Sequence, residues 1–334
     1  MLLKPYYIPK PKPERLPERK CAVTVAIAAI CKMQGGPAII AAEDHMITAG
    51  DVEFEQPQPK MWMQGPHALA LMYGDAAAQA EIAARSALEV VQNHVIDVGE
   101  IAEVYQSNLM GYVRSLAEAE ILAPLNLTSE SFFNRQTLLG PELSAQIISQ
   151  LQEYYIRSGL WRTFGGAILI GADENGGVGA GHIYKIEYGR SVKLDRIGFA
   201  AAGAGQWHAE SQFMFSRYTT EWDFPEALSL LITAKKRAEV APGVGTETDI
   251  VLITTNPRSV SHFTMDSPLV ARLGEIYNDG KRRHDEAITW QHQEVRSFIG
   301  PLLNQGTSVP TTSQTAAPTP TAGPSVPETS EPER

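Results

Sequence analysis

Cysteine is scarce in this 334-residue sequence, because only Cys21 and Cys31 occur. Two cysteines cannot build a disulfide framework. The sequence also has no run of about 18 apolar residues, the length that spans a membrane, and its first 20 residues lack the apolar core of a signal peptide. These absences predict a reduced, cytoplasmic protein with no membrane partner.

Positive charge is also scarce outside the first residues. The net charge of the chain is −10, from 28 Lys and Arg against 38 Asp and Glu. Residues 1–20 carry a net +4 and residues 304–334 a net −2, so residues 21–303 carry −12. Because such an acidic surface repels phosphate, we expect no nucleic-acid partner.

Motifs for cofactors and metals are missing as well. The glycine-rich residues 171–181 contain no GK[ST] and open no helix, which favours a hairpin turn over a phosphate loop. The eight histidines show no HExxH or Cys/His spacing, so we expect no cofactor and no metal and interpret them as surface or helix-face residues. The basic runs 235–237 and 281–284 fall at predicted helix ends, where we expect solvated cations that complement the helix dipole.

Proline is concentrated at the two ends of the sequence: 11 of its 22 prolines lie in residues 1–20 or 310–334. This composition favours extended or disordered chain over a packed core. We therefore predict four parts. They are a Pro/Lys-rich extension or propeptide (1–20), a main domain (21–262) with a helical insertion at about 118–160, C-terminal helices (263–303) with a break at 278–280, and a disordered tail (304–334).

Patterning within the main domain predicts strands and helices in alternating groups. Apolar runs on both sides of Gly35-Gly36-Pro37 predict a hairpin, and a strand over 67–72 ends at Gly74. Asp75 is a good N-cap for an Ala-rich helix that runs to about His94. Further helices are predicted over 98–122, 143–158, 206–218 and 225–239, with strand-like segments at 165–173, 182–189, 191–205 and 248–254. This order predicts an α+β fold: a four-layer αββα sandwich of two largely antiparallel sheets flanked by helices.

Three stretches of this domain together resemble a known family. Residues 39–50 contain Asp44, Lys60 follows 16 residues later, and Met72-Tyr73-Gly74-Asp75 lies 12 to 15 residues beyond Lys60. The second stretch combines 165–171 with His182-Ile183-Tyr184, and the third combines 198–205, two helices and 248–254. Their order and spacing resemble the proteasome-type N-terminal-nucleophile (Ntn) hydrolases, which include the β-subunits of the 20S proteasome, over roughly residues 21–256.

The resemblance implies a chemistry and a set of residues. The first residue of the processed chain supplies the nucleophile, and its free α-amine helps move the proton. Carried over by position, Asp44 is the aspartate, Lys60 the lysine beside the nucleophile and Gly74 the residue whose N–H stabilises the oxyanion. Matching Thr24-Val25-Ala26 to the family's early Thr-x-Ala places Ala22, an inert residue, in the nucleophile position. A shifted register of the first strand offers Cys21 or Thr24 instead. For both, the alternative is an ordinary apolar or β-branched strand residue.

Supporting positions of the family pattern are not matched. The serine of its Gly-Ser-Gly turn corresponds to Ala204, and its later aspartate and serine fall within 240–244, which contains neither residue type. We therefore predict a proteasome β-like, self-assembling subunit of the protein-degradation class, which is a pseudoenzyme without peptidase activity of its own. The alternative is an active, self-processing Ntn peptidase or amidohydrolase. The expected partners are further copies in a homo-oligomer or ring, other proteasome-like subunits or an ATPase, and a peptide substrate if the chain is active.

Overall fold

The computed structural model describes residues 24–49, 52–134, 139–156, 165–173 and 179–305. The chain divides into two compact units, residues 1–279 and 280–334. The predicted extension 1–20, Cys21 and the predicted tail from 306 onward lie outside the described residues. The candidate site belongs to the first unit.

A five-stranded antiparallel sheet begins with the predicted hairpin. Strands β1 (Val25–Met33) and β2 (Gly36–Asp44) pair around Gly35, whose φ of +103° suits a residue without a Cβ. Strand order in this sheet is β10-β1-β2-β11-β12. Its other members are β10 (Phe199–Gly203), β11 (Thr248–Thr255) and β12 (Arg258–Phe263).

A second five-stranded antiparallel sheet has the order β5-β6-β7-β8-β9. Strand β6 and all of β7 except its last residue, Asp173, consist of apolar residues, glycine and a tyrosine, and every residue of both strands is buried, as expected for strands covered on both faces. The bounds are β5 (Met61–Gly65), β6 (Ala68–Tyr73), β7 (Gly166–Asp173), β8 (Ala180–Glu187) and β9 (Arg190–Lys193). A separate two-stranded ribbon is formed by β3 (Met46–Ala49) and β4 (Val52–Glu55).

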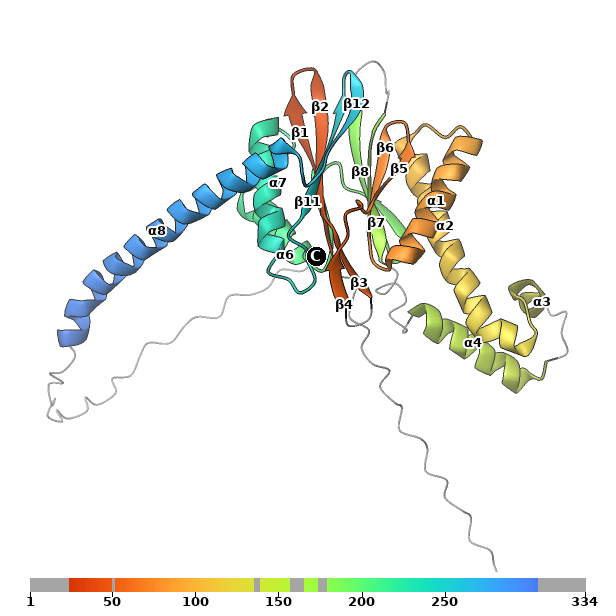
Figure 1. The fold of residues 1–334 in the computed structure, drawn as a ribbon. Coiled ribbons are helices and arrows are strands. Elements are labelled where there is room, and N and C mark those ends of the chain that lie inside the picture. The colour runs from red at the N-terminus through yellow and green to blue at the C-terminus, as the bar shows by residue number, and fades with distance from the viewer. Residues whose placement is uncertain (1–23, 50–51, 135–138, 157–164, 174–178, 306–334) are drawn as a thin grey trace, which may run out of the picture. The chain divides into compact units, whose positions relative to one another are not determined.

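The two larger sheets pack face to face, with helices on both outer faces (Figure 1). Alternate residues of β1 face opposite ways: Ala26 and Ala28 enter the core between the sheets, while Val25 and Ile27 pack toward α6 and α7. The outer layers are α1 (Ala76–Gln92) and α2 (Val98–Ala117) on the second sheet, and α6 (Gln206–Phe215) and α7 (Phe224–Ala238) on the first. The coarse prediction of an α+β arrangement with antiparallel sheets is confirmed.

The predicted insertion forms a small helical lobe with its own apolar cluster, which includes Leu122, Phe132 and Ile147. Its elements are the π-helix η1 (Glu118–Leu122), the 3-10 helix η2 (Ala123–Leu125), α3 (Ser129–Phe133) and α4 (Pro141–Ile156). The predicted helix 98–122 therefore ends as an α-helix at Ala117 and continues as the π-helical turn to Leu122.

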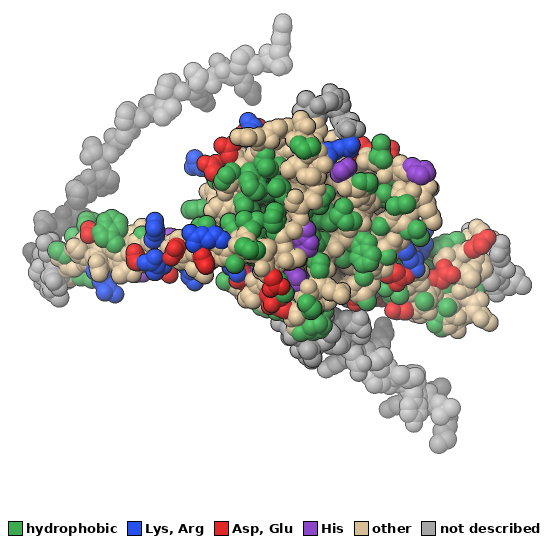
Figure 2. All heavy atoms as spheres, turned by 45° about the horizontal axis from the view of Figure 1, so that its top comes forward, with side chains coloured by type: hydrophobic (Ala, Val, Ile, Leu, Met, Phe, Trp, Pro, Cys, Tyr) green, Lys and Arg blue, Asp and Glu red, His purple; other side chains and the backbone are tan. Residues whose placement is uncertain are grey.

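Helix α8 (Pro268–Gln305) differs from its prediction. The break predicted at 278–280 is wrong, because the helix continues through these residues. A Cβ at Gly280 would meet nothing within 4 Å, and an isolated glycine in an exposed helix costs only about 1 kcal/mol. Figure 2 shows Lys, Arg, Asp and Glu side chains interspersed along this helix.

Candidate active site

Three polar side chains meet at the start of β1. The Lys60 ammonium donates to Thr24 Oγ1 at 2.6 Å and to Asp44 Oδ1 at 2.9 Å, and the Thr24 hydroxyl donates to Asp44 Oδ1. All three residues are buried, Thr24 with 2% and Lys60 with 9% of its surface exposed. The Thr24 hydroxyl therefore has a cation on one side and a carboxylate on the other, and an ammonium in this position can stabilise an alkoxide.

Backbone pairing places these residues. Val25 pairs with Gly203, and the Thr24 carbonyl accepts from the Gly205 N–H at 3.3 Å, so Thr24 lies beside the Gly203-Ala204-Gly205 turn. The turn has no room for a larger residue at its first position, because a Cβ on Gly203 would lie 2.3 Å from the Thr24 carbonyl oxygen. Asp44 ends β2, and its Oδ1 also accepts from the Val25 N–H at 3.3 Å.

Thr24 and Lys60 open onto a pocket of about 200 Å³ that Gly74 also lines. Gly74 follows β6 with a φ of +116°, a conformation that L-residues rarely adopt. The remaining walls are mainly apolar or uncharged: Met46, Ile47, Gln56, Gln58, Pro59, Trp62, Met72, Tyr73, Ala76, Gln79 and Ala80. Lys60 is therefore the charged side chain among the described residues that line this pocket.

A second set of buried ionisable groups lies behind Lys60. The Glu43 Oε1 accepts from the Lys60 backbone N–H at 2.6 Å, and burial raises the pKa of the Glu43 carboxyl to about 8. Within the described part of the chain, Glu43 Oε2 has no hydrogen-bond partner. A carboxyl with this pKa carries its proton at neutral pH, so Glu43 adds little negative charge beside Asp44.

His45 forms an ion pair in the same region. Its Nε2 lies 3.0 Å from Asp249 Oδ1, and its Nδ1 lies 2.8 Å from the Gln56 carbonyl oxygen. The adjacent Asp249 carboxylate raises the pKa of the His45 imidazole. His262 Nε2 lies 2.8 Å from the other Asp249 oxygen. The pair ties β2 to β11 next to the Thr24 site.

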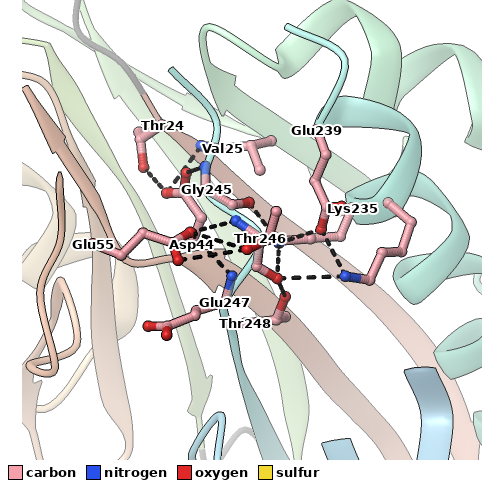
Figure 3. Close-up of polar contacts among 11 residues, drawn as sticks. Thr24, Val25, Asp44, Glu55, Lys235, Glu239, Gly245, Thr246, Glu247 and Thr248 are labelled. Atoms are coloured by element: carbon pink, nitrogen blue, oxygen red, sulfur yellow. Dashed lines mark hydrogen bonds and ion pairs between the residues drawn. The ribbon is translucent and has the colours of Figure 1, made fainter. Parts of the chain in front are cut away.

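The turn before β11 contacts Asp44 through its backbone, as Figure 3 shows. The Gly245 N–H donates to Asp44 Oδ2 at 2.6 Å, so Asp44 holds Thr24 and Lys60 with one oxygen and this turn with the other. The Thr246 N–H donates to Glu55 Oε1, and the Glu247 N–H donates to the same oxygen at 3.2 Å.

The structure shows which of the predicted site residues lie close together. Thr24, Asp44 and Lys60 come together, and Gly74 lines the same pocket. Cys21 lies outside the described residues. Ala204 lies in the turn beside Thr24 and provides no hydroxyl there.

Two interpretations of charged residues are wrong. Lys235 is fully buried rather than solvated, because its ammonium has three oxygen partners at the end of α7. His45 and His182 are buried beside aspartates instead of lying on the surface. Glu43 and His45 are the sequence neighbours of Asp44, so their position could have indicated that they belong to the site. No sequence signal connects Lys235 or Glu55 with Asp44.

No protein-family model matches the chain, and no curated protein matches its sequence. Within the described ranges, no three His, Cys, Asp or Glu side chains form a group that could hold a metal ion. No helix in the described part of the chain is long and apolar enough to cross a membrane.

Proposed function

We propose that this protein is an Ntn hydrolase of the proteasome type, a self-processing amide hydrolase whose nucleophile is Thr24. The observation that carries the proposal is the contact of 2.6 Å between Lys60 Nζ and Thr24 Oγ1, with Asp44 bonded to both. Two stacked antiparallel sheets flanked by helices also match the αββα architecture that the sequence resemblance implies.

The proposed self-processing step breaks the bond between Val23 and Thr24. Thr24 Oγ attacks the Val23 carbonyl carbon, and the amide becomes an ester as the Thr24 nitrogen leaves and takes a proton. Water then hydrolyses the ester, which releases a Val23 carboxylate and leaves Thr24 with a free α-amine. Such an amine has an unperturbed pKa of about 7.7–8.0, which suits a proton acceptor near neutral pH.

The proposed reaction on a substrate repeats this chemistry. Thr24 Oγ attacks a substrate amide carbonyl, the leaving amine takes a proton, and water hydrolyses the resulting acyl ester. The Gly74 N–H is the proposed donor to the oxyanion. Because Met46, Ile47, Trp62 and Met72 line the pocket, we propose a peptide substrate with an apolar side chain next to the cleaved bond.

Intact-mass analysis of the purified full-length chain tests the proposal. We expect the native chain to begin at Thr24 and the Thr24→Ala and Lys60→Ala variants to retain residues 1–23. Lys185→Ala is the matched control, because Lys185 is a buried lysine that pairs with Glu187 at 3.4 Å outside the pocket. A native chain that keeps residue 23 and hydrolyses no peptide would contradict the proposal, and a chain that begins at Cys21 would move the nucleophile there.

A second candidate function is a non-catalytic subunit of the same fold. The turn beside Thr24 carries Ala204, and residues 240–244, before the Gly245 turn, are Val-Ala-Pro-Gly-Val, so neither segment supplies a hydroxyl or carboxylate. This candidate predicts assembly without self-processing. The mass measurement therefore separates the two, since only the hydrolase loses residues 1–23 in a way that depends on Lys60.

A further inference from the structure

Lys235 is a buried cation in the last turn of α7 with three oxygen partners. Its ammonium donates to Glu239 Oε1 at 2.6 Å, to the Gly245 carbonyl at 2.8 Å and to the Thr246 carbonyl at 3.0 Å (Figure 3). An ammonium has three N–H donors, and each has an acceptor here. A buried charge is costly unless it is fully paired, so loss of any of these three acceptors would be costly. The lysine therefore holds the two carbonyls in fixed positions.

The N–H groups of the same turn are held from the other side. We call residues 245–247 the clamped turn. Its amides point to carboxylates, Gly245 to Asp44 and both Thr246 and Glu247 to Glu55, while its carbonyls at 245 and 246 point to Lys235. Charged side chains therefore fix both polar sides of the backbone, which is a stronger restraint than neutral partners would give.

The fit around the turn is close. A Cβ on Gly245 would lie 2.3 Å from Glu55 Oε1 and 3.1 Å from the Cβ of Met46, a residue that lines the pocket. The adjacent Lys236 is different, since it is partly exposed and its contact with the Thr246 carbonyl is 3.4 Å long. The two neighbouring lysines thus differ in how firmly they hold the turn.

We propose that Lys235 is a positioning residue that acts through the clamped turn: it orients the Gly245 N–H, which holds Asp44 against Thr24 and Lys60. Glu55 is its counterpart on the amide side. This inference rests on the proposed function, because the group that Lys235 positions is the nucleophile's aspartate. Lys235 itself does not line the pocket, so it acts on the rate of the reaction rather than on substrate binding.

The experiment compares Lys235→Met with Lys236→Met in the full chain. Methionine keeps the length of the side chain without its charge or donors. Hydrogen exchange of the 245–247 amides reports the turn directly and does not depend on activity. Hydrolysis of a peptide substrate gives kcat and KM. We expect Lys235→Met to lose protection at these amides and to lower kcat about tenfold or more at unchanged KM, and Lys236→Met to keep both near native values.

Glu55 variants give a second route if Lys235→Met does not fold. Glu55→Ala removes the acceptor for the Thr246 and Glu247 N–H groups, whereas Glu55→Gln keeps an oxygen in that place. We expect loss of protection and of kcat with alanine and recovery of most of both with glutamine. If Glu55 were only a structural acceptor, its variants would change the hydrogen exchange of the turn without a matching change in kcat.

The outcomes are distinct. Retained protection in Lys235→Met overturns the clamp, and lost protection with native kcat overturns the positioning role. A native chain that neither self-processes nor hydrolyses peptide refutes the proposed function and with it the catalytic part of this inference. In that case the exchange difference between the two lysine variants still decides whether the clamp exists.

Discussion

At the residue scale, Glu43 makes the stability of the protein depend on pH. Its folded-state pKa of about 8 lies above the ordinary glutamate value near 4.5. The folded state therefore holds this proton more tightly than the unfolded state, and stability falls as pH rises from about 4.5 to about 8. We expect Glu43→Gln to remove this loss, so that it is more stable than the native protein at pH 9 by on the order of a few kcal/mol.

Denaturant unfolding at pH 5 and pH 9 measures this difference. Glu103→Gln is the control, because Glu103 is exposed on α2 and its neutralisation changes the charge without changing a buried group. We expect the two glutamine variants to behave alike at pH 5 and to separate at pH 9. Equal stability of Glu43→Gln and the native chain at pH 9 would show that Glu43 is ionised in the fold without cost.

Residue spacing allowed prediction of only part of this site. The intervals between Asp44, Lys60 and Gly74 indicated which residues to consider, and the register of β1 against β10 then placed Thr24 beside them. That register depends on long-range pairing with Gly203, which no local pattern reveals. Lys235 was missed for a similar reason: a basic run at a helix end is usually solvated, and only the return of the chain at residue 245 buries it.

At the element scale, the end of β6 is held in place by β7. Gly165 has a φ of +71°, and a Cβ on it would lie 1.9 Å from the Tyr73 carbonyl oxygen and 2.6 Å from the Gly74 Cα. Gly165→Ala must therefore displace the backbone that carries the proposed oxyanion donor. We expect a loss of about 2 kcal/mol or more in the free energy of unfolding, together with loss of self-processing.

A second glycine provides the matched control. Gly111 lies exposed in α2, and a Cβ there would meet nothing within 4 Å. We expect Gly111→Ala to stabilise the protein by about 0.5–1 kcal/mol, because alanine loses less backbone entropy in a helix. Thermal unfolding and intact mass measure both variants, and a Gly165→Ala chain with native stability and processing would refute the close-packing argument.

The strands differ in how clearly the sequence pattern predicts them. The hairpin β1–β2 was predictable because both faces of its strands are buried, which produces long apolar runs. The short strands β3, β4, β5 and β12 were missed, since they are four to six residues long and those at the sheet edges are partly exposed. Trp62 and Met63 on β5, for example, are each about 40% exposed.

At the scale of the whole molecule, the two-sheet core explains where the proposed chemistry lies. Thr24 directly precedes β1 of the first sheet, whereas Lys60 and Gly74 flank β5 and β6 of the second. Packing of the sheets through apolar residues such as Ile39 and Leu71 brings these segments to one pocket. The sequence predicted the stacked sheets from the order of its elements, but the pocket exists only because the sheets meet.

Surface composition leads to a prediction about assembly. Figure 2 shows hydrophobic side chains in patches on one face of the molecule. On α6, the exposed fractions are 75% for Trp207, 62% for Met214 and 87% for Phe215. Their spacing of seven and eight residues puts these three side chains on one face of the helix. Exposed aromatic side chains grouped in this way are typical of protein interfaces.

We expect the native chain to form a homo-oligomer through this face of α6, because each aromatic side chain that becomes buried contributes about 1.5–3 kcal/mol. Trp207→Asp with Phe215→Asp should yield monomers at micromolar concentration, as measured by sedimentation velocity. Val240→Asp is the control, since Val240 is 70% exposed but lies outside α6. A native chain that is a strict monomer would exclude both the subunit role and an α6 interface. Monomers of the control but not of the double variant would instead place the interface near residue 240.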